Sequence, residues 1–553
     1  MDGADVSARP AGELPRAAPR RTDIPLARIH AWGDDRARRL EAAGPILFAV
    51  LSLVYLLPTM VIAARKLMWN DELYTFYIAR LPSMGDVWMA LASRGEQTPP
   101  FFYVLTRLSL GAFGVSGLTI RLPEILGFWL MCACLFVFVR RRAAASAALC
   151  AAALPLVTMA YFYAYEARPY GLVLGFGALA LVAWQSAALG QRRGLSIIGL
   201  ALALGATVSA HYYGVFVVAA LAAGEAVRAA SSRRLDVPVW IALAAPAISL
   251  ALHLPLIRAG AAYADAFWAI PRWVNIPDFY TYLLGPAVVP LAAILVLAAL
   301  YAVTIAQERR DGVPSATPPD PAVHEIAAAC AFALIPFLAV FLAKVATGAF
   351  THRYALPAIV GFCVLGGFGM GRVARRHPLM ALVTAGCLVG WFVLAQGREI
   401  VQPTGMSQPV TQQLVDRPAE WLRAAPRTDL PLVVADPHNF TVLSHYGAPE
   451  VRERMVYLAD PALALKHLGH NSVERGMLDL IGPWFGMRVV EFEPFLAGHD
   501  EFLIYGDFIR LGFLNWIVPE LQARGMRLEL LNRGGDNLFL LARGGPAVPR
   551  PSR

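Results

Sequence analysis

Long apolar stretches recur along most of this sequence. The first runs from Gly44 to Ala64 without an ionisable side chain, and a stretch of that length crosses the roughly 30 Å core of a bilayer as one helix. Ten more follow, near residues 119–139, 143–164, 169–190, 195–210, 212–228, 237–257, 284–306, 325–343, 354–371 and 378–397. Charged residues make up only 16% of the chain, against roughly 25% in soluble domains. We therefore predict a polytopic, all-α membrane domain of eleven transmembrane helices over residues 44–400.

Arginine clusters fall at every second connection between these stretches. They are Arg140-Arg141-Arg142, Arg192-Arg193, Arg233-Arg234, Arg309-Arg310 and Arg375-Arg376. Because loops rich in Lys and Arg stay in the cytoplasm, the clusters predict a cytoplasmic N-terminus and an outer C-terminus. Residues 1–43 contain eight arginines and are expected to be a disordered cytoplasmic tail. The first apolar stretch begins too late and runs too long for a cleaved signal peptide.

One helical segment, "PPFFYVLTRLSLGAFG", is not predicted to span the membrane. Its apolar run is short, it contains Arg107 and it opens with two prolines. We interpret it as a helix lying in the membrane interface, so that residues 65–118 form one long outer loop.

The sequence beyond residue 400 has a different, mixed polar texture. Four short runs resemble β-strands, and helical patterns separate them: "LPLVVAD", "RMVYLAD", "EFLIYGD" and "NLFLLAR". We predict a soluble α/β domain over residues 401–545, on the outer side, followed by a short tail at 546–553.

An acidic pair, Asp71 and Glu72, follows the first apolar stretch closely. Aromatic residues suited to the lipid–water boundary surround it in "MWNDELYTFYIAR". Two acids after a helix end are often simply solvated, but a carboxylate here could also act as a base at the membrane surface. As neighbours the two point in different directions, so one could face a reaction while the other holds the loop.

Three other outer connections combine polar and aromatic side chains. They hold Glu166, Arg168 and Tyr170; His211 with Tyr212 and Tyr213; and His352, Arg353 and Tyr354. Each group taken alone could be ordinary interfacial packing. Together on one face, they favour a shared site for an anionic ligand. In this site Arg168 would bind a phosphate bidentately, and Glu166 would orient the Arg168 side chain.

Several other classes of site are not supported by the sequence. The net charge of +9 comes from arginines that orient the chain in the membrane, so nucleic-acid binding is not expected. The chain lacks a Walker-type loop, a dinucleotide fingerprint and a zinc-protease helix. All six cysteines lie in apolar segments, which indicates free thiols. Asp436, His438 and His445 have suggestive spacing but are interpreted as structural or surface residues.

Five motifs in order carry a family resemblance. They are "WNDELYTFYIAR", "TPPFFYVLTRLSLGAFG" with "LTIRLPEILG", "YFYAYEARPYGLVLGFGALAL", "HYYGVFVVAA" and "HRYALPAI". Over residues 44–400 the chain resembles the membrane glycosyltransferases of the GT-C class. The most similar groups are the glycosyltransferase family 39-like protein O-mannosyltransferases, the lipid A aminoarabinose transferase and the rhizobial lipopolysaccharide core transferases.

The resemblance implies a polyprenyl-phosphate donor carrying a hexose or pentose, and inverting transfer on the extracytoplasmic side. It also implies an acidic base in the first outer loop, which maps onto Asp71, with Glu72 second. Many relatives carry His or Lys where this chain has Thr98, so Arg168, His211 or Arg353 would supply more of the phosphate contact. The sequence demands no metal, although some enzymes of the class use a divalent cation.

The acceptor stays open between a glycan, a lipid and a protein hydroxyl. The high Arg, Ala and Gly content suggests a GC-rich bacterium as the source, and we expect the protein in the cytoplasmic membrane of such a cell. A multi-pass transporter or flippase of a lipid-linked or small anionic substrate is the main alternative, but the nearly charge-free spans and the lack of repeated halves argue against it. A third reading is a scaffold that presents the C-terminal domain.

Overall fold

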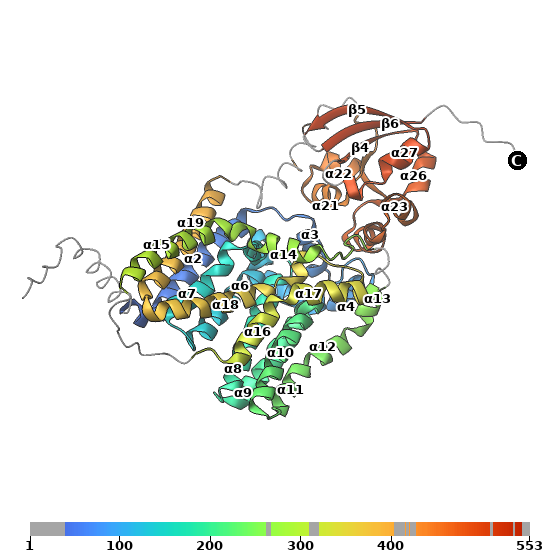
Figure 1. Cartoon of the computed structure of the whole chain (residues 1–553). Helices are drawn as coiled ribbons and strands as arrows, with labels where there is room; N and C mark the ends of the chain where they lie inside the picture. Colours follow the sequence, from blue (N-terminus) through green and yellow to red (C-terminus); the bar gives the residue numbers. More distant parts are fainter. Residues whose placement is uncertain are drawn as a thin grey trace, which may run out of the picture.

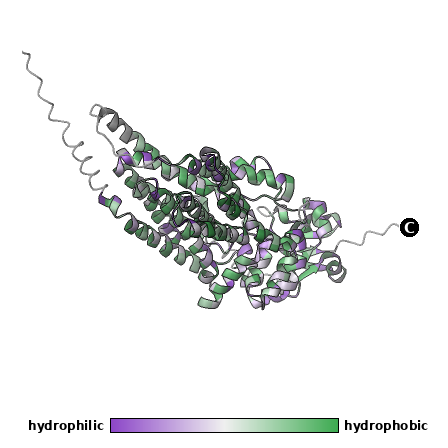
Figure 2. Cartoon of the chain, turned by 90° about the horizontal axis from the view of Figure 1, so that it is seen from below, coloured by the Kyte–Doolittle hydropathy of each residue, from purple (hydrophilic) through white to green (hydrophobic). Residues whose placement is uncertain are grey.

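The computed structural model describes residues 39–261, 267–308, 320–402, 415, 420, 427–508, 512–534 and 537–544. A bundle of helices forms the larger part of the molecule, and a small α/β domain is joined to one end of it (Figure 1). Hydrophobic residues dominate the bundle, whereas the C-terminal domain is more mixed (Figure 2). Nearly all of the predicted 1–43 tail and the whole 546–553 tail lie outside the described residues.

Among the described residues, eight helices are long and apolar enough to cross a membrane, and three bent pairs raise the number to as many as eleven. The straight spans are α2 (Gly44–Arg65), α6 (Gly117–Arg140), α8 (Tyr170–Ala188), α9 (Arg193–Ala210), α10 (Val215–Ser232), α14 (Asn275–Leu284) continuing into α15 (Val288–Glu308), α18 (Ala358–Arg376) and α19 (Pro378–Val401). The predicted polytopic helical fold is confirmed, and every predicted stretch has a counterpart.

Three of the predicted spans are bent rather than straight. They are α7 (Ala145–Ala153) with the 3-10 turns that run to Tyr165, α11 (Val237–Ala244) and α12 (Pro246–Leu252) with α13 (Leu254–Ala261), and α16 (Val323–Ala333) with α17 (Ile335–Leu342). The bends measure 76°, 65° and 47°. A proline stands beside each break, at Pro155, Pro255 and Pro336, where the ring removes a backbone donor and clashes with the preceding turn.

The segment between α2 and α6 folds as three short helices, α3 (Asn70–Ala79), α4 (Met84–Ala92) and α5 (Pro100–Phe113). The α5 helix lies within the segment predicted to lie in the interface, and it is not among the described helices that could span the membrane. Its Arg107 donates hydrogen bonds from Nη1 to the carbonyl oxygens of Ala79 and Leu81. These contacts satisfy carbonyls at the C-terminal end of α3.

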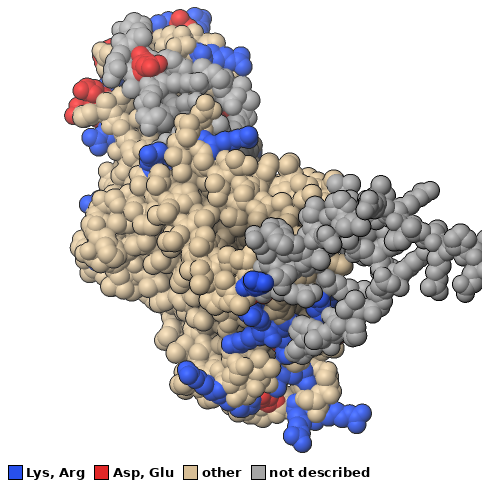
Figure 3. Space-filling model, turned by 90° about the vertical axis from the view of Figure 1, so that its left-hand side faces the viewer, with Lys and Arg blue, Asp and Glu red and all other residues tan. Residues whose placement is uncertain are grey.

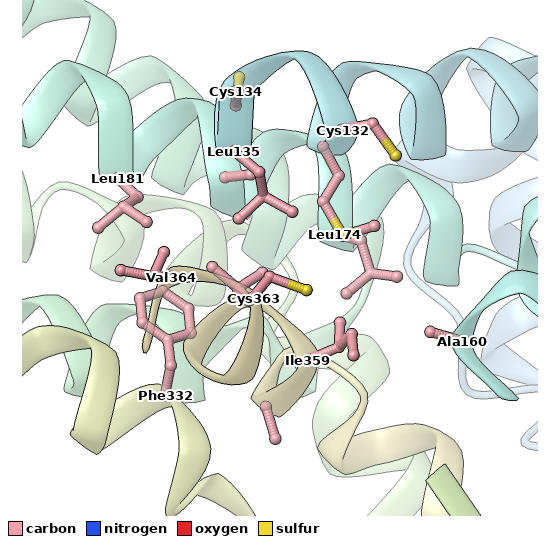
Figure 4. Packing of buried hydrophobic residues seen from close by; sticks show 14 of the residues in the cluster. Cys132, Cys134, Leu135, Ala160, Leu174, Leu181, Phe332, Ile359, Cys363 and Val364 are labelled. Carbon is pink, nitrogen blue, oxygen red and sulfur yellow. The ribbon is translucent and has the colours of Figure 1, made fainter. Parts of the chain in front are cut away.

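Helices α6 and α8 approach each other closely through glycines. A Cβ atom placed on Gly127 would lie 2.6 Å from the carbonyl oxygen of Gly171. Small residues permit such backbone contact between membrane helices. Nearby, Cys132 and Cys363 pack among leucine and isoleucine side chains (Figure 4). All six cysteines are free, and four of them are buried.

The C-terminal domain contains a six-stranded sheet with the order β3-β2-β1-β4-β6-β5. Its strands are β1 (Leu432–Val434), β2 (Met455–Ala459), β3 (Val489–Glu491), β4 (Glu501–Asp507), β5 (Arg527–Gly534) and β6 (Asn537–Arg543). The first four are mutually parallel, while β6 is antiparallel to both β4 and β5. The four predicted runs correspond to β1, β2, β4 and β6. The short β3 and the exposed edge strand β5 were not predicted.

Helices cover both faces of this sheet: α21 (Pro437–Tyr446), α22 (Pro449–Arg454), α23 (Pro461–Leu468), α24 (Ser472–Gly476), α25 (Gly482–Phe485), α26 (Phe492–Gly498) and α27 (Ile517–Ala523). The α21 helix also packs on α3. Thr441 Oγ1 donates to Asn70 Oδ1 at 2.6 Å, and the Met68 backbone N–H donates to the Tyr446 hydroxyl at 2.8 Å. One apolar core therefore continues from the sheet into α3, α4 and α5.

Lysine and arginine side chains gather at the end of the helical bundle opposite the C-terminal domain (Figure 3). The C-terminal domain packs on the α3–α5 segment at one end of the bundle (Figure 1), and the basic residues that gather on the bundle itself lie toward the other end (Figure 3).

Candidate active site

A cavity of about 430 Å³ lies between the helical bundle and the C-terminal domain. Its walls come from the start of α3, the α4–α5 connection, the segment before α8, the segment before α18, and several loops of the C-terminal domain. The predicted site residues on this wall are Asp71, Arg168, His352 and Arg353. Four residues from three separate connections thus meet in one hollow.

Asp71 is held by an ion pair at the centre of this group. Arg353 Nη1 lies 2.5 Å from Asp71 Oδ2, and the two side chains are 19% and 17% exposed. Arg168 Nη1 also donates to the Asp71 carbonyl oxygen at 3.4 Å. Burial raises the pKa of Asp71, but the charges of Arg353 and Arg168 outweigh it and hold the pKa below its ordinary value. Asp71 is therefore an ionised carboxylate.

Glu72 points away from the cavity into the protein. Arg121 donates to it from Nε at 2.6 Å and from Nη2 at 2.7 Å, and the Ala167 backbone N–H donates at 2.8 Å. Burial raises the pKa of Glu72, but Arg121 and Lys66 outweigh it and lower the pKa to about 2. Glu72 thus ties α3 to α6 and to the segment before α8.

The partner of Arg168 differs from the prediction. Arg168 forms a two-pronged pair with Glu96, at 2.8 Å from Nη1 and 3.3 Å from Nη2. The prediction that Glu166 orients Arg168 is wrong. Both carboxylate oxygens of Glu166 are buried without a hydrogen-bond partner among the described residues, and burial raises its pKa to about 7.

The remaining predicted residues lie outside this cavity. The Tyr170 ring centroid is 6.0 Å from the Arg353 guanidinium carbon and 5.5 Å from the His211 ring. Burial lowers the pKa of His211 to about 3, so its imidazole is neutral and contributes no positive charge. Tyr170 therefore packs against Arg353, and His211 packs against Tyr170. Tyr212 lines a neighbouring cavity.

That neighbouring cavity has a volume of about 540 Å³ and is largely apolar. Its wall consists mainly of aliphatic and aromatic side chains from α10, α12, α13 and α17. Glu96, Gln97, Phe267 and Tyr354 line both cavities. An apolar hollow thus adjoins the arginine-rich one.

Two residues of the cavity were missed from the sequence. Glu96 stands just before the "TPPFF" motif, where Thr98 Oγ1 donates to it at 2.7 Å. His438, which was interpreted as a structural or surface residue, lines the cavity from the start of α21 and lies edge-to-face against Trp69, with ring centroids 6.4 Å apart. Among the described residues, no group of three or more His, Cys, Asp or Glu side chains could hold a metal ion.

Comparisons with known proteins agree with this architecture. Residues 97–257 match the family described as dolichyl-phosphate-mannose-protein mannosyltransferase. None of the curated proteins matches the chain significantly. Among solved structures, ArnT from Cupriavidus metallidurans in the apo state has a TM-score of 0.56 at 14% identity, covering 92% of this chain and 99% of that chain. The same protein bound to undecaprenyl phosphate has a TM-score of 0.51 at 13% identity, covering 91% and 99%.

The Archaeoglobus fulgidus oligosaccharyltransferase complex with Zn and sulfate matches at a TM-score of 0.43 and 12% identity, covering 83% of this chain and 68% of that one. The predicted likeness to GT-C membrane glycosyltransferases is confirmed by the family match and by the ArnT structures. Residues 97–257 therefore match the dolichyl-phosphate-mannose-protein mannosyltransferase family, within a chain whose fold is similar to that of ArnT.

Proposed function

We propose that this protein is a glycosyltransferase that moves a sugar from a polyprenyl-phosphate donor to an acceptor hydroxyl. The observation that carries the proposal is the ionised Asp71 beside Arg353 and Arg168, in a polar cavity that adjoins an apolar one. The family match over residues 97–257 and the fold shared with ArnT, which has been solved bound to undecaprenyl phosphate, support it.

The two cavities suit the two halves of such a donor. Arg168 and Arg353 can bind phosphate oxygens through their planar guanidinium groups. The apolar cavity of about 540 Å³ can receive the first isoprene units of the tail, because its wall is mainly aliphatic and aromatic. Tyr354 lines both cavities and so marks the point where the phosphate would meet the tail.

Arg353 then has two possible anionic partners. In the structure it pairs with Asp71, and a donor phosphate would compete for the same guanidinium group. When Arg353 turns to the phosphate, Asp71 loses its strongest positive neighbour and becomes more basic. Donor binding would therefore release the base that the reaction needs.

The reaction follows as one displacement. Asp71 accepts the proton of the acceptor hydroxyl, and the acceptor oxygen forms a bond to the anomeric carbon of the sugar. The bond from that carbon to the phosphate oxygen breaks, and its electron pair leaves with the polyprenyl phosphate. Arg353 and Arg168 stabilise the negative charge of the leaving group. A single displacement inverts the anomeric centre.

The reaction would take place on the extracytoplasmic side of a bacterial cytoplasmic membrane. The cavity lies at the end of the bundle that carries the C-terminal domain, while basic side chains gather toward the opposite end. Basic loops stay in the cytoplasm, which supports an outer position for the cavity.

The test uses the full chain reconstituted in nanodiscs. Undecaprenyl phosphate should bind more tightly than undecaprenol, because only the phosphate engages the arginines. Proteoliposomes loaded with lipid-linked sugars and with an envelope extract of the source cells, which supplies the acceptor hydroxyl, should release free polyprenyl phosphate and form a product of inverted anomeric configuration. Equal binding of the two lipids, or a product with retained configuration, would overturn the proposal.

A further inference from the structure

Loops at the carboxyl ends of three strands in the C-terminal sheet line the same cavity. Pro437 and His438 follow β1, Ser472 belongs to the connection after β2, and Leu514 follows β4, and all four residues line the cavity. These three strands are adjacent and parallel in the sheet. In open α/β sheets, ligands bind beyond the carboxyl ends of parallel strands, where the strand order reverses. Here that reversal lies between β1 and β4.

The connections that follow these strands contain buried polar groups without a hydrogen-bond partner. Ser472 Oγ, Asn471 Oδ1 and both side-chain polar atoms of Asn515 are buried and have no hydrogen-bond partner among the described residues. The three residues are only 8%, 6% and 6% exposed. Ser472 lines the cavity itself, Asn471 precedes it, and Asn515 follows the lining residue Leu514. Unpaired polar groups are rare in native interiors, so a group of three indicates a ligand.

The donor does not account for these groups. Its proposed phosphate ligands, Arg168 and Arg353, come from the helical bundle, whereas the unpaired groups come from the C-terminal domain across the cavity. Asp71 lies on α3, the helix on which α21 of the C-terminal domain packs. An acceptor held by the domain would therefore present a hydroxyl toward Asp71.

We propose that Ser472, Asn471 and Asn515 form an acceptor subsite and that the acceptor is a polyhydroxylated glycan head group. This inference rests on the proposed function and names the acceptor class for the same site. Hydroxyl and amide side chains both donate and accept, which matches the hydroxyls of a sugar. One common way of binding an extended peptide is along an exposed sheet edge. Here the cavity is lined by loops that follow the strands, and the edge strands β3 and β5 contribute nothing to its wall.

Binding to the full chain in nanodiscs tests this subsite without requiring turnover. The probes are lipopolysaccharide core oligosaccharide, a mannan oligosaccharide, a Ser/Thr-rich peptide and undecaprenyl phosphate. The variants are Ser472→Ala and Asn515→Ala, and the matched control is Asn532→Ala, an exposed asparagine on β5. Unfolding temperatures establish that each variant is folded.

We expect at least one oligosaccharide to bind the wild type and the control equally. Each lost hydrogen bond should weaken that binding about five- to tenfold in Ser472→Ala and Asn515→Ala. Undecaprenyl phosphate affinity should stay within about twofold in both. Unchanged oligosaccharide binding in both variants, no oligosaccharide binding by the wild type, or variant-sensitive binding of the peptide instead would each overturn the subsite. Failure to prefer undecaprenyl phosphate over undecaprenol would reject the donor proposal separately.

Discussion

Arg353 Nη1 lies 2.5 Å from Asp71 Oδ2, although 282 positions separate the two residues in the sequence. The contact joins the connection between α2 and α6 to the segment before α18. It keeps Asp71 ionised and, at the same time, occupied. The proposed base and the proposed phosphate ligand therefore restrain each other until another anion enters the cavity.

Replacing Asp71 by Asn should abolish transfer while leaving the protein folded. Asn is nearly isosteric but cannot accept a proton at neutral pH, and general-base catalysis contributes roughly a hundred- to ten-thousandfold. Undecaprenyl phosphate should bind at least as tightly as in the wild type, because Arg353 is released from its pair. Initial transfer rates and lipid binding, measured on the same preparation, check both expectations.

Glu72→Gln is the companion variant and should behave differently. It removes the charge opposite Arg121 in a fully buried pair, and disrupting such a pair costs on the order of 3 kcal/mol. We expect a lower unfolding temperature with residual transfer in the folded fraction. A stable but inactive Glu72→Gln protein beside an active Asp71→Asn protein would exchange the roles of the two acids. Full transfer activity in both variants would exclude a catalytic role for this acidic pair.

Arg168→Ala should weaken undecaprenyl phosphate binding more than Arg140→Ala. Only Arg168 lines the cavity, while Arg140 ends α6 and is exposed. A lost charge-assisted contact costs on the order of 1.5–3 kcal/mol, or roughly ten- to a hundredfold in affinity. Titration of each variant with undecaprenyl phosphate measures the difference, and equal affinities would exclude Arg168 from the phosphate site.

The membrane fold could be predicted because a bilayer imposes a length of about 20 apolar residues on each spanning helix, whatever its neighbours are. The bends beside Pro155, Pro255 and Pro336 were not predicted, since apolar length does not encode an angle. In the C-terminal domain, β3 has only three residues and β5 carries Arg, Glu and Asn among its leucines. Neither strand gives a clear apolar pattern.

The candidate site was predictable only in part. Arg168 and Arg353 were located by their positions at helix ends on one face, and their binding roles stay predictions. The choice of Glu166 as the partner of Arg168 relied on nearness in sequence, but backbone direction placed Glu166 inside the protein and brought Glu96 to the guanidinium group. His438 reaches the cavity only because α21 packs on α3, a contact that no local pattern specifies.

Gly127→Ala should destabilise the bundle. The new methyl group would lie 2.6 Å from the Gly171 carbonyl oxygen, so α6 and α8 would have to separate, at a cost of about 1–3 kcal/mol. Gly386→Ala on α19 is the matched control, because nothing lies within 4 Å of its added Cβ. Thermal unfolding in one detergent compares them, and equal unfolding temperatures would contradict close α6–α8 packing.

A cysteine at Ser116 should react with a membrane-impermeant maleimide in intact cells. Ser116 is exposed at the start of α6, and Arg140 is exposed at the other end of that helix. The positive-inside rule then predicts that a cysteine at Arg140 reacts only after the membrane is permeabilised. The reverse labelling pattern would invert the predicted topology and move the cavity to the cytoplasmic side.

Glu166→Gln should stabilise the protein at pH 8 and have little effect near pH 4.5. Burial raises the pKa of Glu166 to about 7 from its ordinary value of 4.5. Between these values the unfolded chain loses the proton while the folded protein retains it, so wild-type stability falls as the pH rises. The difference should reach up to about 3 kcal/mol above pH 7. Denaturant unfolding at a series of pH values measures it.

Glu520→Gln provides a control with the opposite sign. Hydrogen bonds from His467 and Lys466 lower the pKa of Glu520 to about 2, so its stabilising effect is fully present above about pH 4.5 and is lost only as the pH falls toward 2. Above about pH 5 the variant should therefore be less stable than the wild type, whereas Glu166→Gln should be more stable than the wild type above pH 7. If the stability difference between Glu166→Gln and the wild type did not change between about pH 5 and pH 8, Glu166 would be ionised in the folded protein. Its partner would then be Lys66, because Lys66 is the charge that most opposes the raised pKa of Glu166.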